Sequence, residues 1–265
     1  MERKLGISLG AYGSMPLDEQ LSLMKANGFS ATFTGAENPN LEVIIPALKE
    51  AGISCDNFHA PFNKINDIWR VGDAGDHMLS RLLTSVEKCA KYEVPALVVH
   101  LSSGEKAPYV NAIGRDRWAQ LMDLADAKGV TICYENQRKL SNLAFAFEQF
   151  PNAAFCWDCG HEFCFTPGRH YMPLFGSKTK ALHIHDNKCQ YNGDDHMIPY
   201  EANIDFDYVA DMIAASKFEG TLMLELIMHK SGEYETTPVD EYARRAGLAA
   251  QRLAAAVEKA DEKYL

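Results

Sequence analysis

The chain has 265 residues, of which 47% are hydrophobic and 23% are charged, and this composition excludes a chain that is disordered over most of its length. Its 26 basic and 36 acidic residues give a net charge of −10, which argues against a nucleic-acid partner, because phosphate backbones are bound by basic residues. The segment Met1–Lys4 is polar, and no apolar run approaches the roughly 18 residues of a membrane span, so we expect a cytoplasmic protein without membrane contact.

Short β-like runs alternate with amphipathic segments along the chain. The β-like runs are Lys4–Leu9, Phe29–Thr34, Ile53–His59, Ala96–Leu101, Val130–Glu135, Ala154–Asp158, Ala181–Asp186 and Thr221–Ile227. The helical patterns are Leu17–Ala26, Asn40–Ala51, His77–Tyr92, Asn111–Lys128, Leu140–Gln149, Phe206–Ser216 and Pro238–Lys259, with a weak one at Tyr171–Phe175. This alternation predicts a parallel sheet, and eight units in this length predict an α/β fold with one domain over residues 1–265, a single (β/α)8 TIM barrel. An open doubly wound sheet is the alternative, although no Gly-x-Gly-x-x-Gly follows the first run.

Ligand-type side chains stand where successive β-like runs end. They are His59, His100, Glu135, Asp158 with His161, His183 with His185, and Glu225, and Asp194 and His196 follow in the loop after the seventh run. In a parallel barrel these ends meet on one face, which is where barrel active sites lie. Because histidine and carboxylate groups bind divalent metals, the pattern predicts a metal site on that face.

Two of these carboxylates, Glu135 and Glu225, lie in apolar segments where an unpaired charge would be costly to bury. A lone strand-end histidine is usually a satisfied polar residue, but no Arg or Lys recurs at these strand ends to pair with the carboxylates. A shared metal is therefore the economical explanation. The Cys156-x-x-Cys159 pair permits a zinc or redox interpretation, but it lies in a strand-like run, so we expect reduced core thiols.

The strand-end motifs resemble the xylose isomerase-like TIM-barrel superfamily of sugar isomerases and epimerases, which also includes type IV apurinic endonucleases. The matching motifs are His59–Phe62, Val99–Leu101, Glu135–Asn136, Asp158-x-x-His161, His183-x-His185-Asp186-Asn187, Asp194-x-His196 and Glu225. In the isomerase branch the resemblance implies one divalent metal held by Glu135, Asp158, His183 and Glu225. We choose His183 over His185 because an acidic residue follows the family's ligand histidine by three residues, and Asp186 stands three residues after His183. His161 corresponds to the family's substrate-contacting histidine.

The endonuclease branch, in which nine residues hold three zinc ions, is the rival interpretation. Matching residues stand at all nine positions: His59, His100, Glu135, Asp158, His161, His183, Asp194, His196 and Glu225. The net charge of −10 argues against it. The loop after His196 departs from the family, because Tyr200 and Ala202 stand where glycines are common, and we expect Tyr200 to narrow the pocket and contact the substrate.

The resemblance implies an isomerase or epimerase acting on a keto sugar or related polyol by proton transfer through a metal-stabilised enediolate, with Glu135 and Glu225 as acid and base and His161 assisting. The expected metal is Mn, Zn, Co or Mg, one per chain and three at most. Asn136 is a further expected substrate contact. A keto-sugar lyase or dehydratase, the tri-zinc nuclease and a catalytically silent binding barrel are the alternatives.

The expected partner is a small sugar, unphosphorylated because no phosphate-binding loop is visible. The alanine-rich segment Ala246–Ala256 is expected to pack on the barrel, with packing on a second copy in a homo-oligomer as the alternative.

Overall fold

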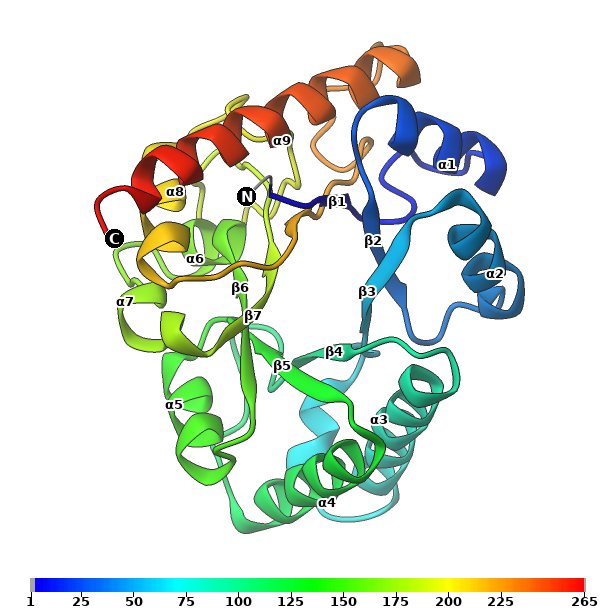
Figure 1. Cartoon of the computed structure of the whole chain (residues 1–265). Helices are drawn as coiled ribbons and strands as arrows, with labels where there is room; N and C mark the ends of the chain where they lie inside the picture. The colour runs from blue at the N-terminus through cyan, green and yellow to red at the C-terminus, as the bar shows by residue number, and fades with distance from the viewer. Residues whose placement is uncertain (1–2, 265) are drawn as a thin grey trace.

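Parallel strands form a central barrel, and helices surround it (Figure 1). The computed structural model describes residues 3–264, so the predicted domain limits at residues 1 and 265 lie outside the described part. The strands are β1 (Leu5–Ile7), β2 (Ala31–Gly35), β3 (Ser54–His59), β4 (Ala96–His100), β5 (Thr131–Glu135), β6 (Ala154–Asp158), β7 (Thr179–His183) and β8 (Leu222–Leu224). The α-helices are α1 (Leu17–Ala26), α2 (Leu41–Ala51), α3 (Asp73–Lys91), α4 (Ala112–Lys128), α5 (Leu140–Gln149), α6 (Cys159–Phe165), α7 (Met172–Phe175), α8 (Phe206–Ala215) and α9 (Val239–Asp261). Two 3₁₀ turns, η1 (Ile65–Trp69) and η2 (Gly176–Lys178), complete the described elements.

The strands follow one another around the barrel in chain order, and β8 returns to β1. Three register pairs join β1 to β8, including Gly6 opposite Met223, whereas one register pair, Gly6 opposite Ala31, joins β1 to β2. Between β7 and β8 a bridge pairs Ile184 with Leu224, and the amide of Ile184 donates to the carbonyl of Met223 at 2.9 Å. The sheet is therefore closed, which confirms the predicted barrel and shows that the open-sheet alternative was wrong.

Side-chain size explains how the strands pack. Small and branched residues fill a buried cluster of β4 to β7, and its members are Ala96, Val98, Cys133, Ala154, Cys156 and Ala181. Larger side chains such as Trp118 and Phe155 pack in the main core that the helices cover. Cys156 belongs to the first cluster and Cys159 to the second, and all seven cysteines are free thiols. The two thiols therefore do not converge on one ligand, in line with the core-thiol interpretation.

Helix α9 lies against α8 and against the C-terminal end of α1 (Figure 1). Its alanines Ala243, Ala246 and Ala250 are fully buried, and a Cβ at Gly247 would stand 2.6 Å from the carbonyl oxygen of Asn27. The alanine-rich segment thus packs on the barrel. Among residues 3–264, none of the helices has both the length and the apolar character needed to cross a bilayer.

The structure departs from the predicted elements near the strand ends. Helix α6 was not predicted, because it begins directly after β6 and Asp158 both ends the strand and caps the helix, its Oδ1 accepting from the amide of His161 at 2.6 Å. Helix α3 begins at Asp73, four residues before the predicted start at His77. Strand β7 ends at His183, and residues up to Asp186 continue only as isolated bridges.

Candidate active site

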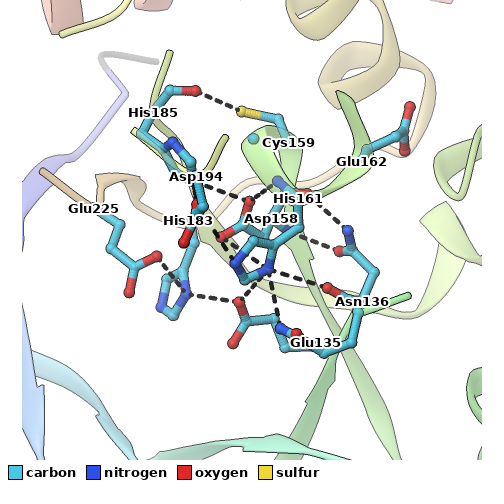
Figure 2. Close-up of polar contacts among 12 residues, drawn as sticks. Glu135, Asn136, Asp158, Cys159, His161, Glu162, His183, His185, Asp194 and Glu225 are labelled. Atoms are coloured by element: carbon cyan, nitrogen blue, oxygen red, sulfur yellow. Dashed lines mark hydrogen bonds and ion pairs between the residues drawn. The ribbon is translucent and has the colours of Figure 1, made fainter. Parts of the chain in front are cut away.

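The predicted ligand-type residues converge at the carboxyl end of the barrel. His59, His100, Glu135, Asp158 and His183 are the last residues of β3, β4, β5, β6 and β7. Glu225 follows β8 directly, and Figure 2 shows its carboxylate, that of Glu135 and the ring of His183 pointing toward one another. A cavity of about 450 Å³ opens above them.

The central cluster consists of Glu135, Asp158, His183 and Glu225. Each offers one ligand atom, and the four atoms all lie within 4.8 Å of one another. Nδ1 of His183 is 3.6 Å from Oε1 of Glu135 and 3.5 Å from Oε2 of Glu225. Both ring nitrogens of His183 and Oδ2 of Asp158 are buried without a hydrogen-bond partner. Buried polar atoms are almost always paired in proteins, so a divalent cation fits as the missing partner of this donor set.

Neighbouring rings hold His183 in place. Its imidazole stacks on Phe33 of β2 at a centroid distance of 4.6 Å and an angle of 21°. The ring of His59 lies on a nearly parallel plane at 5.8 Å. His183 is completely buried, so its ring has a fixed orientation toward the carboxylates, as preorganised metal sites require.

Glu135 contacts several histidines of the site. Its Oε2 lies 2.9 Å from Nε2 of His100 and 3.2 Å from Nε2 of His59, and its Oε1 lies 3.1 Å from Nδ1 of His161. Burial alone would raise the pKa of Glu135, but His100 and His183 outweigh burial and hold it well below its usual range. Burial likewise would lower the pKa of His183, yet Glu225 and Glu135 raise it to about 10. Without a cation, therefore, the carboxylate is ionised and His183 carries a proton in the place of a metal.

A second group of ligand atoms lies beside the first. His185, Asp194 and His196 also bring one ligand atom each to within 4.8 Å of one another, and a third such group is His59, Glu135 and His183. The rings of His185 and His196 stack at 4.0 Å and 5°. Nε2 of His185 lies 3.2 Å from Oδ1 of Asp158, which connects the two groups. The ring of His185 fits only because residue 160 is glycine, since a Cβ there would stand 1.9 Å from it.

His161 lies between the two groups. Its Nδ1 is 3.4 Å from Oδ2 of Asp158, and its Nε2 is 3.8 Å from Oδ1 of Asp194. Its ring stacks on Phe165 at 4.6 Å. The structure thus brings together all nine residues that match the endonuclease pattern, and His185 joins them.

Two predicted substrate contacts do not line the cavity. Asn136 is completely buried, and its side-chain amide donates to the carbonyl of Asp158 and accepts from the amide of Asp158, both at 2.8 Å. Asn136 therefore positions β6. The ring of Tyr200 packs between Phe206 at 4.8 Å and the guanidinium of Arg252 at 3.8 Å, and Tyr200 does not line the cavity above the cluster.

Several cavity-lining residues were not predicted from the sequence. Gln137, Arg138, Phe165 and Lys230 line the cavity, and Nζ of Lys230 lies 2.7 Å from Oδ2 of Asp194. The only sequence signal for Gln137 and Arg138 is that they directly follow Glu135-Asn136. Nothing in the sequence marks Phe165 or Lys230, because both come from segments whose paths depend on the closed barrel.

Comparison with known proteins agrees with this architecture. The family model described as xylose isomerase-like TIM barrel matches residues 13–254. Among solved structures, D-psicose 3-epimerase with D-tagatose from Clostridium cellulolyticum H10 superposes with a TM-score of 0.74 at 13% identity, covering 96% of this chain and 99% of that one. An L-ribulose 3-epimerase has a TM-score of 0.76 at 16% identity, covering 99% and 97%. At these identities the likeness establishes the fold.

Two further proteins are also similar to this chain. The 3-keto-D-glucoside 4-epimerase of E. coli in its apo form superposes with a TM-score of 0.71 at 15% identity, covering 94% of this chain and 99% of that one. The uncharacterized protein y4fM of Sinorhizobium fredii (strain NBRC 101917 / NGR234) is 30% identical over 130 residues, 49% of this chain. The match spans 40% of that protein's own length.

Proposed function

Because the chain belongs to the xylose isomerase-like TIM-barrel family, we propose that it is a metal-dependent isomerase or epimerase of a keto sugar or related polyol. The observation that carries the proposal is the buried cluster of Glu135, Asp158, His183 and Glu225, with its unpaired ligand atoms. The sugar epimerases among the structural neighbours support the same reaction class.

Glu135, Asp158, His183 and Glu225 would hold one divalent cation, Mn, Zn, Co or Mg. When bound, the cation would polarise a substrate carbonyl and stabilise the negative charge that develops on its oxygen. The cluster alone carries three carboxylates, so it also offers the negative charge that balances a divalent ion.

The chain's own residues move the proton. Glu225 is partly exposed to the cavity, and its carboxylate would accept the proton from the carbon beside the carbonyl. Glu135 lies on the other side of Nδ1 of His183. After taking up a proton from solvent water, it would deliver that proton to the neighbouring carbon in an isomerase or to the opposite face of the same carbon in an epimerase. Glu225 would then release to solvent the proton that it had accepted, which restores the starting charges. His59 and His100 hold Oε2 of Glu135, so the carboxylate keeps one orientation. His161 would orient the substrate oxygen from its place beside Glu135.

The test begins with the metal content of protein purified without chelators or affinity-column nickel, measured by elemental mass spectrometry. The loaded protein is then given a panel of ketoses in D2O, and incorporation of deuterium into the sugar is followed by NMR. We expect Glu135→Gln and Glu225→Gln to lower incorporation by about 10²–10⁴-fold, the usual contribution of a general acid or base. Glu148→Gln, an exposed position on α5, is the matched control. Exchange at the wild-type rate in either site variant would remove that residue from the proposed role.

The additional ligand groups favour one rival function. His185, Asp194 and His196, and His59, Glu135 and His183, provide room for more than one cation beside the central cluster. A metal-dependent phosphodiesterase of the apurinic-endonuclease type would use such an arrangement with up to three zinc ions. Two or three zinc ions per chain, together with cleavage of an oligonucleotide that contains an abasic site, would favour this function over the isomerase. One metal per chain and no cleavage would exclude it.

A further inference from the structure

The cleft above the strand ends continues past the buried cluster. The cavity of about 450 Å³ described above, here called the inner lobe, adjoins a second hollow of about 610 Å³, the outer lobe. His59, Phe62 and Glu225 line both lobes. The outer lobe extends over the loops that follow β2 and β3, where Glu37 and Asn38 line it, and Arg81 of α3 lines it as well.

The size of the cleft exceeds what one monosaccharide needs. Small-molecule sites in proteins measure about 300–1,000 Å³ and enclose ligands much larger than a ketose. Either lobe alone reaches this range. A ketose whose reacting carbons lie at Glu225 in the inner lobe would therefore leave the outer lobe free for a substituent of the same molecule.

The junction between the lobes carries an exposed aromatic ring. Phe62 is 51% exposed, and its ring stacks on His100 at 4.9 Å and 26°. An exposed, rigidly held aromatic face offers apolar area to the C–H groups of a sugar ring at little cost in side-chain entropy. Its position at the junction would let it contact both halves of an extended ligand.

The polar groups of the outer lobe suit a neutral partner. The guanidinium of Arg81 donates to both carboxylate oxygens of Glu37, at 2.8 and 2.7 Å, so the two charges pair with each other. Asn38 adds an amide, whose nitrogen donates to Oγ1 of Thr34 at 3.2 Å and whose oxygen accepts from the backbone amide of Asn40 at 3.0 Å. One N–H and one oxygen lone pair of this amide are therefore left for a ligand. Planar amide, carboxylate and guanidinium groups offer the several donors and acceptors that adjacent hydroxyl groups require. The paired charges leave no excess positive charge to attract a phosphate.

We propose that the outer lobe binds a second sugar unit, so that the substrate is a keto sugar carrying a glycosidic substituent. The proposal rests on the function proposed above, because it places the reacting sugar beside Glu225. It names the substrate class as neutral keto-glycosides rather than free ketoses or ketose phosphates. Asn38 and Phe62 are the residues that contribute to this preference.

Binding can be measured without any turnover. The manganese-loaded protein is titrated by calorimetry with D-fructose and with lactulose, a fructose that carries a galactosyl group. A gain of one or two net hydrogen bonds predicts a dissociation constant for lactulose lower by about fivefold to thirtyfold. We expect Asn38→Ala and Phe62→Leu each to reduce this ratio by about fivefold. The control Asn152→Ala, an exposed asparagine before β6 at the opposite end of the barrel, is expected to preserve the ratio.

The outcomes separate this inference from the proposed reaction. Preferential binding of lactulose that is lost in Asn38→Ala supports the outer-lobe subsite even if no deuterium enters either sugar, in which case the isomerase proposal fails alone. Deuterium incorporation into D-fructose with equal affinities for the two sugars keeps the reaction and overturns the subsite. A ratio that is unchanged in both outer-lobe variants also overturns it, and so does failure of both sugars to bind.

Discussion

Two buried carboxylates stand four residues apart and have opposite surroundings (Figure 2). Glu162, on α6, is 2% exposed, and its oxygens accept from Nε1 of Trp157, the amide of Tyr171 and the hydroxyl of Tyr208, at 2.9, 3.0 and 3.0 Å. Asp158, at the end of β6, is completely buried, and its Oδ2 has no hydrogen-bond partner. Glu162 therefore has a full set of protein donors. Asp158 instead faces histidine and carboxylate side chains that could themselves be metal ligands.

This contrast shows that burial of an acid does not by itself identify a functional site. A buried acid with enough donors stabilises the fold, as Glu162 does by joining α6 to α8. A buried acid whose neighbours are further unpaired ligand atoms has an incomplete environment, which an added cation would complete. Four experiments test this distinction.

Removal of metal should have the largest effect. We expect a chelator to abolish deuterium incorporation into a true substrate and readdition of the metal to restore it. At a metal concentration of 100 times the dissociation constant, binding would stabilise the fold by about 2.7 kcal/mol, so the melting temperature should rise on loading. Differential scanning calorimetry measures this rise. A melting temperature that no divalent ion changes would mean that the cluster around Asp158 is structural, like the environment of Glu162.

Exchange of the two acids for their amides should give opposite results. Asp158→Asn should weaken metal binding by at least about 100-fold, because it removes a charged ligand and keeps the shape that caps α6. Glu162→Gln should retain the metal but destabilise the fold by about 1–3 kcal/mol, because its new NH2 group would face donors. Metal titration and urea unfolding of both variants measure the two effects. Equal metal loss in the two variants would refute the distinction.

Addition of one methyl group at position 160 should disturb the ligand group that contains His185. A Cβ at position 160 would stand 1.9 Å from the ring of His185, so Gly160→Ala must displace that ring. We expect a destabilisation of about 1–3 kcal/mol and reduced metal affinity. Gly35→Ala, where a Cβ meets nothing within 4 Å, is the control for unfolding. Unchanged stability and metal affinity of Gly160→Ala would show that the ring of His185 moves without consequence.

The pH dependence should show the most gradual change, measured per pH unit. Burial lowers the pKa of His183, but the carboxylates of Glu225 and Glu135 outweigh it and raise the pKa to about 10 in the metal-free protein. Because the unfolded value lies near 6.5, the folded chain holds an extra proton, and the resulting stability is complete below about pH 6.5 and decreases by at most about 1.4 kcal/mol per pH unit as the pH rises toward 10.

A bound metal replaces that proton, so the loss should be smaller in the loaded protein. Melting temperatures of chelated and loaded protein between pH 7 and 9 provide the comparison. Parallel pH curves for the two forms would contradict the assignment of His183.

Much of this architecture was predictable because it depends on local patterns. Helices α1 and α5 and strand β6 have the predicted limits, since apolar spacing and turn residues define them. The convergence of Glu135, Asp158 and Glu225 was predictable because parallel strands bring their carboxyl ends to one face. That residues 1–265 form one domain, and that these residues act in catalysis, stay predictions.

Side-chain direction and short helices were not predictable. Asn136 directly follows Glu135 in the sequence, yet its side-chain amide bonds to the backbone of Asp158. Tyr200 lies four residues after His196, yet its ring packs on Phe206. Helix α6 has seven residues, and tertiary packing rather than a repeating apolar pattern stabilises so short a helix. The outer lobe arises where loops after different strands meet, and no local pattern encodes that meeting.

The closure of the barrel has a consequence for synthesis of the chain. β1 is made before β8, yet it shares more register pairs with β8 than with β2, and the hydroxyl of Ser8 donates to the carbonyl of Leu226, 218 positions later. At about 5–20 residues per second, the ribosome needs roughly ten to forty seconds to extend the chain from β1 to the end of β8. During that interval the first strand has one open edge, and Glu225 has not yet been made. The nascent chain therefore closes its barrel, by pairing β8 with β1, and completes its set of metal ligands in the same late step.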